Sequence, residues 1–497
     1  MRRFLPILSL ALVLALAAPA QARWFPLDPV DAGDVQRPVV DLGIEDGGGL
    51  VYIKTDAAGS RAWLSRLASG GWTKPAALSG AGTTEAAVAA GESGRLAAAW
   101  IQNGVVYGAL VGAPATPLSA GGGAANLAIE MGVNGDAYAV WAQNGDVRAA
   151  RLSESTWEPV PAALDVDPAR PAGAGALRPK VAVAADGSAL VVWGEVFPDG
   201  STHVLARRIY GTSLSALPRD ATLAGGSADS PEVDIEYDRT YAWVAFRQVV
   251  GGVSRTFARR LRASTFEAPA ALDAGGASVG PALGMSSSGI GHAVSVSAGR
   301  LLGATLRDDA FAAARRNDRF GAVTNAAVAT SERHDTALVW RAGADASAVV
   351  RGRLAPDTTR LGRAALLSRS SLGPVAPGAL SASANRIGDV AAAFVQGAPG
   401  ARSVGAAMYD LPPTPPTLRD LPDVVRRRVL VRWQPGLEFG GRQRYRVLVD
   451  GRKAGVTRGR SLRIRLRRGK HRITVVGVDR RGQRSKRSRR QTVLVRR

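Results

Sequence analysis

The chain has no cysteine among its 497 residues. This absence excludes disulfide bonds, thiol nucleophiles, thiolate zinc sites and iron–sulfur clusters. Histidine is almost as scarce, and a site built from several histidines is not expected because the four are widely separated: His203, His292, His334 and His471. We therefore predict neither a cofactor nor a bound metal. Only six of the 64 basic residues are lysine, and this arginine bias with abundant alanine is typical of a GC-rich bacterial genome.

Long hydrophobic runs are also missing, apart from one near the start of the chain. Residues 1–22 combine Arg2 and Arg3, an apolar stretch over residues 4–18, and the small-residue sequence Ala20-Gln21-Ala22. This pattern predicts a signal peptide that is removed on export. A transmembrane anchor is the alternative, but the apolar stretch is shorter than the about 20 residues that span a bilayer. We expect an extracellular or surface-associated protein without a membrane span.

The central part of the chain is repetitive. Residues 178–211 show it best, with an alternating strand, an Asp186-Gly187 turn, a second strand ending in Trp193, a loop and a third strand. Similar units recur at spacings of 41 to 54 residues. Six of the eight residues aligned at the end of the second strand are aromatic, and the eight are Lys54, Trp100, Trp141, Trp193, Phe246, Val296, Trp340 and Phe394.

Units of this length hold four short strands, and one four-stranded sheet cannot bury both faces alone. We therefore predict an all-β protein in which residues 23–411 form a β-propeller. Eight blades are expected, with seven as the fallback because the sixth unit lacks its aromatic residue. The last unit has only three strands, so we expect residues 24–30 to supply its fourth and close the ring. The alternative is that this segment is a loose tail.

A polar side chain follows the aligned position by two residues in six units. These residues are Asp56, Gln102, Gln143, Glu195, Gln248 and Gln396. One interpretation is structural, with each side chain bonding exposed backbone groups. The other is a polar ring on one face of the disc, rimmed by loops 195–202, 247–253 and 342–347, that binds a glycan or a protein.

A proline-rich linker, PPTPPT over residues 412–417, leads into a second domain, residues 418–497. Its segments alternate apolar with basic residues, as half-buried antiparallel strands do. Trp433, Tyr445 and the run 475–485 resemble the pattern of fibronectin type III domains. The resemblance implies an immunoglobulin-like β-sandwich with a spacer or binding role and no chemistry. His471 stands where that family usually has tyrosine, so the tyrosine's usual side-chain bond is in question.

Almost all the net charge lies in this second domain. Residues 411–497 hold 27 basic and 5 acidic residues, a net of +22, whereas residues 1–410 hold 37 and 36, a net of +1. Self-repulsion of this size favours an anionic partner, since arginine suits phosphate and carboxylate groups. Arginine drift on a solvated surface is the alternative. The candidate binding residues are Arg463, Arg465, Arg467, Arg484, Lys486 and Arg487.

No catalytic residue is predicted. The chain lacks G-x-S-x-G, H-E-x-x-H, P-loop and EF-hand patterns, and it lacks the repeated S-x-D-x-G-x-x-W turns of sialidase-like propellers. The sequence therefore favours a non-catalytic binding protein at or outside the cell surface. The partner expected for the cationic domain is an anionic envelope polymer or polysaccharide, and non-specific nucleic-acid binding is compatible with the same charge. A glycan-active enzyme, such as a sialidase-like glycosidase, or a lectin is the alternative.

Overall fold

The computed structural model describes residues 22–43, 47–68, 71–318, 321–378, 380–438 and 443–496. The expected signal peptide lies outside the described residues except for Ala22. The chain divides mainly into two compact units, residues 23–410 and residues 411–496. Within the described ranges, no helix has the length and apolarity needed to cross a membrane. Single 3-10 turns are the helical elements: η1 (Glu92–Gly94), η2 (Gly175–Leu177), η3 (Asp345–Ser347), η4 (Pro356–Thr358) and η5 (Ser370–Leu372).

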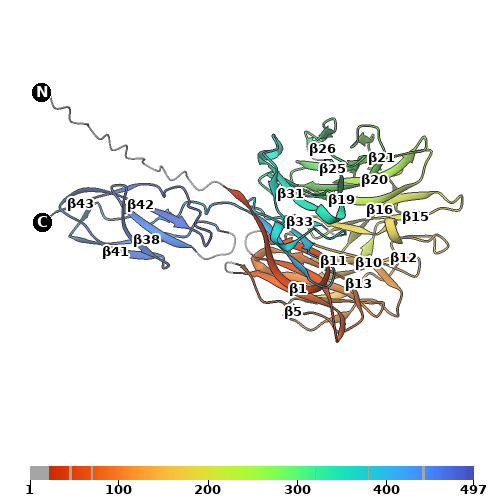
Figure 1. The fold of residues 1–497 in the computed structure, drawn as a ribbon, viewed down its shortest axis with the longest axis horizontal. Coiled ribbons are helices and arrows are strands. Elements are labelled where there is room, and N and C mark those ends of the chain that lie inside the picture. Colours follow the sequence, from red (N-terminus) through yellow and green to blue (C-terminus); the bar gives the residue numbers. More distant parts are fainter. Residues whose placement is uncertain are drawn as a thin grey trace, which may run out of the picture. The chain divides into compact units, whose positions relative to one another are not determined.

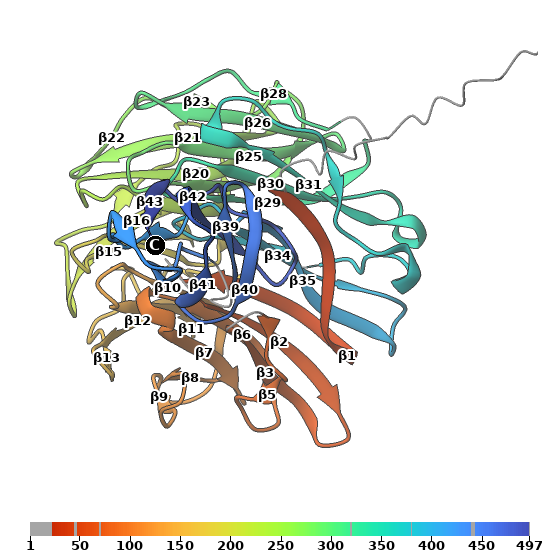
Figure 2. The ribbon, with the colours of Figure 1, turned by 90° about the vertical axis from the view of Figure 1, so that its left-hand side faces the viewer.

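The larger unit consists of antiparallel sheets in which consecutive strands are neighbours. Figure 2 shows these sheets arranged around a common centre, as the blades of a propeller. Blades 1 to 4 contain β1 (Arg23–Leu42), β2 (Gly48–Asp56), β3 (Gly59–Ala68), β4 (Gly71–Trp72) and β5 (Ala76–Ala77); β6 (Thr83–Ala90), β7 (Leu96–Gln102), β8 (Val105–Leu110) and β9 (Thr116–Pro117); β10 (Ala124–Met131), β11 (Ala137–Gln143), β12 (Asp146–Ser153) and β13 (Thr156–Pro159); β14 (Lys180–Val183), β15 (Ala189–Val196), β16 (Thr202–Tyr210), β17 (Ser213–Leu214) and β18 (Arg219–Asp220).

The other four blades repeat this plan. They contain β19 (Ala228–Ile235), β20 (Tyr241–Val250), β21 (Val253–Arg262), β22 (Thr265–Phe266) and β23 (Ala270–Ala271); β24 (Ser278–Met285), β25 (Gly291–Ser297), β26 (Arg300–Arg307), β27 (Ala310–Phe311) and β28 (Arg315–Arg316); β29 (Val323–Thr330), β30 (Thr336–Ala342), β31 (Val349–Ala355) and β32 (Ala365–Leu366); β33 (Ser381–Ala384), β34 (Val390–Gln396) and β35 (Arg402–Asp410). The described residues of the larger unit thus form eight blades.

The long strand β1 closes the ring. Its first half, residues 23–33, pairs with β35 and completes blade 8, while its second half, residues 34–42, pairs with β2 and begins blade 1. The innermost strands of successive blades contact one another around the circle, and β33 of blade 8 contacts β1. The predicted closure by the N-terminal segment is therefore confirmed, and β35 is left with no free edge.

The aligned aromatic residues pack between blades. Trp193 and Trp340 are completely buried, as is Phe246. One core cluster joins Tyr138 of blade 3 to Trp193 of blade 4. Burial of a large side chain stabilises the fold by about 2–3 kcal/mol at each such position. Stacking of neighbouring blades therefore buries the sheet faces that a single blade would leave in water.

The pairing register corrects the alignment of the first unit. In blades 3 and 5 the innermost strand bulges opposite the aligned aromatic residue, Trp141 or Phe246. The same bulge in blade 1 lies opposite Tyr52 and not opposite Lys54. Beyond the bulge, β2 is two residues longer than β11, its counterpart in blade 3. An alignment based on strand ends therefore displaced the first unit by two residues. Asp56 therefore lies outside the repeated position, which Lys54 occupies.

The propeller has two faces with different connections. The turns between strands two and three of each blade and the segments that join blades lie at one end of the strands, which we name the first face. The turns between strands one and two and between strands three and four lie at the other end, the second face. Consecutive antiparallel strands impose this division, because each turn reverses the chain direction.

The smaller unit is an immunoglobulin-like β-sandwich (Figure 1). One sheet has the order β36 (Thr417–Leu418), β38 (Arg428–Gln434) and β41 (Ser461–Arg465); the other has the order β37 (Val424–Val425), β43 (Gln491–Val495), β42 (Gly469–Val478), β39 (Arg444–Val449) and β40 (Arg452–Thr457). The strand β38 alternates exposed and buried residues along its length, as predicted. Trp433, Val431 and Val475 belong to the single core between the sheets.

The imidazole of His471 contacts two acceptors in the sandwich. Its Nδ1 lies 2.7 Å from Asp450 Oδ2, and its Nε2 lies 2.9 Å from the carbonyl oxygen of Arg467. Both acceptors require an N–H, so the two bonds together favour the imidazolium. The bond to Asp450 accordingly raises the pKa of His471.

We expect this contact to make the sandwich pH-sensitive. A histidine pKa that is raised by folding adds stability that is complete below the unfolded value of about 6.5 and is lost as the pH rises through the folded value. His471→Gln should therefore speed amide exchange in β42 at pH 5.5 and have a smaller effect at pH 9. Hydrogen exchange of peptides covering residues 469–478 measures this difference. An effect of equal size at both pH values would contradict the ionic role.

Candidate functional site

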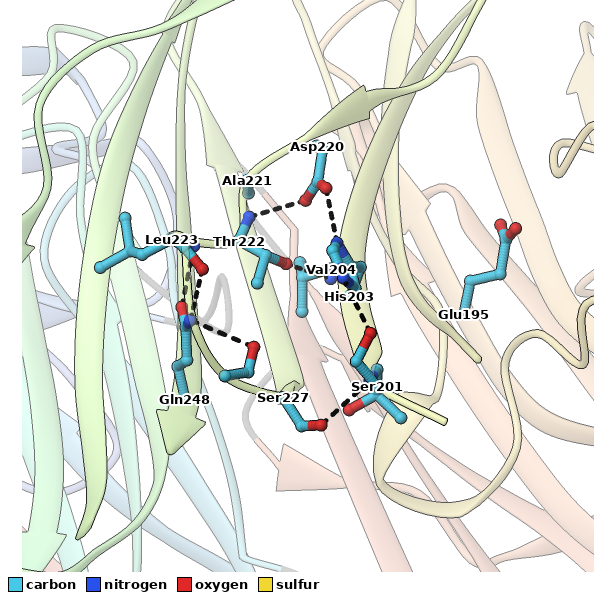
Figure 3. A network of polar contacts seen from close by, with 12 residues as sticks. Glu195, Ser201, His203, Val204, Asp220, Ala221, Thr222, Leu223, Ser227 and Gln248 are labelled. Atoms are coloured by element: carbon cyan, nitrogen blue, oxygen red, sulfur yellow. Dashed lines mark hydrogen bonds and ion pairs between the residues drawn. The ribbon is translucent and has the colours of Figure 1, made fainter. Parts of the chain in front are cut away.

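The polar residues of the repeated position bind the connections between blades. Gln143 donates to the carbonyl oxygens of Ala120 and Gly122 at 3.0 and 3.1 Å. Gln248 donates to the carbonyl of Leu223 at 2.7 Å and accepts from its N–H at 2.9 Å (Figure 3). In each case the partner lies in the segment that enters the same blade. These side chains therefore fix the inter-blade connection at the first face.

Three of the remaining four residues also form hydrogen bonds near the first face. Gln396 accepts from the N–H of Arg369 at 3.0 Å, and Gln102 accepts from the N–H of Gly80 at 3.2 Å. Glu195 is 2% exposed and meets Trp193 Nε1 at 3.4 Å. Asp56 stands apart, at the exposed end of β2 in an ion pair with Arg61. The structure thus shows hydrogen bonds within the repeated position at five of the six predicted residues, and it places Asp56 apart from the other five.

Gln248→Ala should destabilise the propeller. The side chain is completely buried, and its removal leaves the N–H and the carbonyl of Leu223 without this partner. The cost of unsatisfied buried polar groups is about 1–3 kcal/mol. Urea unfolding measures the loss, and Gln36→Ala, at an exposed position of β1, is the matched control. Equal midpoints for the two variants would show that the bonds add nothing.

A serine, a histidine and an aspartate meet near the same face (Figure 3). His203 Nε2 lies 3.1 Å from Ser201 Oγ, and His203 Nδ1 lies 2.6 Å from Asp220 Oδ2. This order resembles a nucleophile, base and orienting acid. However, Ser201 Oγ also donates to the Asp199 carboxylate at 2.6 Å, and a carboxylate can only accept. The single hydroxyl proton is thus taken, and the cluster ties the loop 197–201 to β18.

The second face opens into a cavity of about 720 Å³ at the channel between the innermost strands. Carboxyl groups from blades 1, 3 and 5 line it at Asp41, Glu130 and Asp234. Asp41 accepts from the N–H of Ala90 at 2.7 Å, and Asp234 accepts from the N–H of Met285 at 2.8 Å, so both bridge to the next blade. Sequence patterns could not reveal this group, because its members are about 90–100 residues apart.

The channel raises the pKa values of these acids. Burial raises the pKa of Asp41 to about 6 and that of Asp234 to about 7. The surrounding protein raises the pKa of Glu130, and the charges of Asp41 and Asp234 raise it further. Solvent still reaches Glu130 through the cavity. Among the described residues, no group of three or more histidine, aspartate or glutamate side chains has metal-binding geometry.

Glu130→Gln should stabilise the propeller at high pH. A carboxyl pKa that folding raises stabilises the protein at low pH, and that stability is lost as the pH rises from the unfolded value toward the folded one. The variant should therefore melt at the wild-type temperature at pH 4 and above it at pH 9. Differential scanning calorimetry checks this, with Glu158→Gln, on exposed β13, as the control. A Tm gain that is the same at pH 4 and pH 9 would contradict repulsion as the cause.

Five arginines surround a hollow at one end of the sandwich. The hollow has a volume of about 630 Å³ and is lined by Arg427, Arg465, Arg467, Arg468 and Arg496, with buried Leu466 and Val495 between them. None of these five side chains forms an ion pair with a described residue. Arg465 also lies directly opposite Arg428 across the strand pair, where like charges repel. We name this group the arginine hollow.

A second cationic segment follows β42. In residues 479–490 the hydroxyls of Ser485 and Ser488 accept from the N–H groups of Gly477 and Val475, at 2.8 and 2.9 Å. These buried serines hold the segment along β42 while its cations point outward. Exposed here are Arg484, Lys486, Arg487, Arg489 and Arg490, which we name the basic loop. The six predicted residues are thus all exposed, with two in the arginine hollow, three in the basic loop and Arg463 on the outer side of β41.

Comparisons with known proteins give structural matches only. No known protein family matches the sequence, and no characterised protein sequence matches it either. Among solved structures, the Dos1 propeller covers 79% of this chain and 95% of its own at 11% identity, with a TM-score of 0.45. The Hadza microbial sialidase Hz136 covers 63% and 73% at 10% identity, with a TM-score of 0.38. An α-L-arabinanase from Penicillium chrysogenum covers 57% and 92% at 11% identity, with a TM-score of 0.37.

Proposed function

We propose that this is an exported binding protein whose sandwich holds anionic polymers of the cell envelope. The arginine hollow is the observation that carries the proposal, because it gathers five unpaired guanidinium groups around one cavity. Guanidinium groups donate paired hydrogen bonds to phosphate and carboxylate groups. The near-neutral propeller adds little to this attraction, so the sandwich supplies the electrostatic part of binding.

A polymer fits better than an isolated anion. The arginine hollow and the basic loop come from different segments, and a chain with repeated charges could contact both at once. Contacts that share one ligand raise the overall affinity without any new chemistry. The bound polymer would also offset the self-repulsion of a domain with a net charge of +22. The fibronectin type III resemblance agrees with such a binding or spacer role.

The test uses the chain from residue 23 on immobilised polygalacturonate and polyphosphate. The variant R465Q/R467Q/R468Q removes three charges from the arginine hollow, and R484Q/K486Q/R487Q removes three from the basic loop. The control R300Q/R360Q/R363Q removes three exposed arginines of the propeller. We expect both sandwich variants to elute at a lower salt concentration than the unmodified chain. The control should elute at the same salt concentration as the unmodified chain. Equal elution of all three triple variants would reject a specific role for the sandwich.

A second candidate is glycan hydrolysis at the channel cavity. Glu130 favours it, because a carboxyl group with a raised pKa beside other carboxylates is the arrangement of a general acid. The backbone bonds of Asp41 and Asp234 weigh against it, since they occupy the oxygens that a nucleophile or base would use. Release of nitrophenol from aryl glycosides, abolished by Glu130→Gln, would establish this activity. Absence of turnover by the unmodified chain across such substrates would remove it.

A further inference from the structure

A separate pocket lies between blades 4 and 5 on the second face. It has a volume of about 320 Å³. Blade 4 contributes Arg208 and Tyr210 near the end of β16 and residues 215–217 of the following turn, together with Arg219 of β18. Blade 5 contributes its turns at residues 239–240 and 263–264. The pocket shares no residue with the channel cavity.

The pocket is built around a buried arginine that has no acidic partner. Arg208 is 7% exposed. Its Nε donates to the carbonyl of Ala263 at 3.4 Å, and its Nη2 donates to the carbonyl of Thr240 at 3.2 Å. Its buried Nη1 has no hydrogen-bond partner. Asp186 and Asp238 affect Arg208 only through space, while burial lowers its pKa.

In the two neighbouring blades an arginine at this position is paired with an acid. Arg151 of blade 3 and Arg260 of blade 5 lie at the same register position as Arg208. Arg151 forms an ion pair with Asp136 at 2.8 Å, and Arg260 forms one with Glu236 at 3.0 Å. Blade 4 keeps the arginine without the acid. A buried charge without a counter-ion is costly, and a bound anion would supply the missing partner.

The rim of the pocket is also cationic. Arg219 is exposed and forms no ion pair with a described residue. Arg239 is already paired with Asp186 at 2.6 Å. No acidic residue lines the pocket. Two uncompensated positive charges therefore face this space, and one carboxylate can accept hydrogen bonds from both guanidinium groups.

The remaining lining groups suit a sugar ring. Tyr210 is 41% exposed; Arg239 lies over its ring at 5.3 Å, and the remaining surface of the ring can contact the C–H face of a sugar. Ser215, Thr240 and Ser264 line the same space and can exchange hydrogen bonds with ring hydroxyls. The volume lies near the lower end of the range for small-ligand sites, about 300–1,000 Å³. A single ring with one carboxylate matches the size, the charge and the polarity.

We propose that this pocket binds one carboxylated sugar residue, with Arg208 and Arg219 taking its carboxylate. The sandwich plays no part in this site, so each proposal can fail without the other. In binding an anionic polysaccharide, the propeller would then recognise one sugar residue, while the sandwich attracts the polysaccharide by its charge.

The experiment titrates the chain from residue 23 with methyl galacturonide and with neutral methyl galactoside. Isothermal titration calorimetry is carried out in 300 mM NaCl, which screens the sandwich. Arg208→Met keeps the side-chain length without the charge. It also removes the hydrogen bonds to the carbonyls of Ala263 and Thr240, so the Tm of each variant is measured beside its affinity. Arg219→Gln tests the exposed partner, and Arg360→Gln is the matched control on the propeller surface.

We expect the galacturonide to bind with a Kd of about 1 mM or below, which is typical of a ligand with few contacts. Arg208→Met and Arg219→Gln should each weaken it at least tenfold, Arg219→Gln should do so with an unchanged Tm, and Arg360→Gln should bind normally. Failure of the unmodified chain to bind the galacturonide would overturn the proposal. Equal affinity for the neutral galactoside, or undiminished binding by both pocket variants, would overturn it as well.

Discussion

Deletion of residues 23–33 should lower the free energy of unfolding of the propeller by more than about 5 kcal/mol. This half of β1 is the outer strand of blade 8, and its loss exposes the edge of β35. It also removes Leu27, which is completely buried, and Trp24, which packs edge-to-face on Tyr409 at 5.4 Å. Loss of a buried leucine alone costs about 2–5 kcal/mol, and loss of a tryptophan costs about 3–5 kcal/mol. Urea unfolding measures the change.

A point variant separates closure from a general effect of truncation. Leu27 donates its N–H to the carbonyl of Leu367 at 2.8 Å and so ties blade 8 to blade 7 as well. Leu27→Ala should lose about 2–5 kcal/mol. Pro26→Ala, at an exposed position of the same strand, should lose almost nothing. A deletion with an unchanged unfolding midpoint would mean that the ring does not depend on its N-terminal segment.

The affinity for polyphosphate should fall by roughly 10²–10³-fold between 50 and 200 mM salt. Each phosphate that a cation neutralises releases counterions, and a single-stranded polyanion gives a slope of about −0.7 per contact in a plot of log K against log salt. About six contacts, shared between the arginine hollow and the basic loop, account for the expected change. Fluorescence titration of the chain from residue 23 at four salt concentrations measures the slope.

The variant R465Q/R467Q/R468Q should reduce this slope by about 2, because three contacts are lost. R300Q/R360Q/R363Q, on the propeller, should leave it unchanged. Affinity that does not vary with salt would contradict an electrostatic mode of binding. A slope that the hollow variant does not alter would place the contacts elsewhere on the chain.

The sequence by itself determined the type of each element. Alternation of apolar and polar residues is local and has a period of two, so it revealed the blade strands and the sandwich strands such as β38. The aligned aromatic residues revealed the repeat because each blade needs a large buried side chain to pack against its neighbour. The incomplete last unit even predicted that the start of the chain closes the ring. The charge of the second domain needed only counting.

Only the tertiary structure decided the register and the sites. The bulge opposite Tyr52 is visible only once the strands are paired, so the strand-end alignment misplaced Asp56. Arg208 looks like any strand arginine in the sequence. Arg151 and Arg260 each form an ion pair with an acid of their own blade, Asp136 and Glu236. Arg208 has no such partner in blade 4.

The same holds for the channel acids. Asp41, Glu130 and Asp234 lie on blades 1, 3 and 5, and closing the ring brings them into one cavity. Local patterns record whether a residue is buried, because the alternation of a strand fixes which side it faces. They do not record which distant blade supplies its neighbour. Residues of that neighbouring blade determine the charge partners and the pKa value of each side chain. The candidate sites therefore exist only in the closed ring.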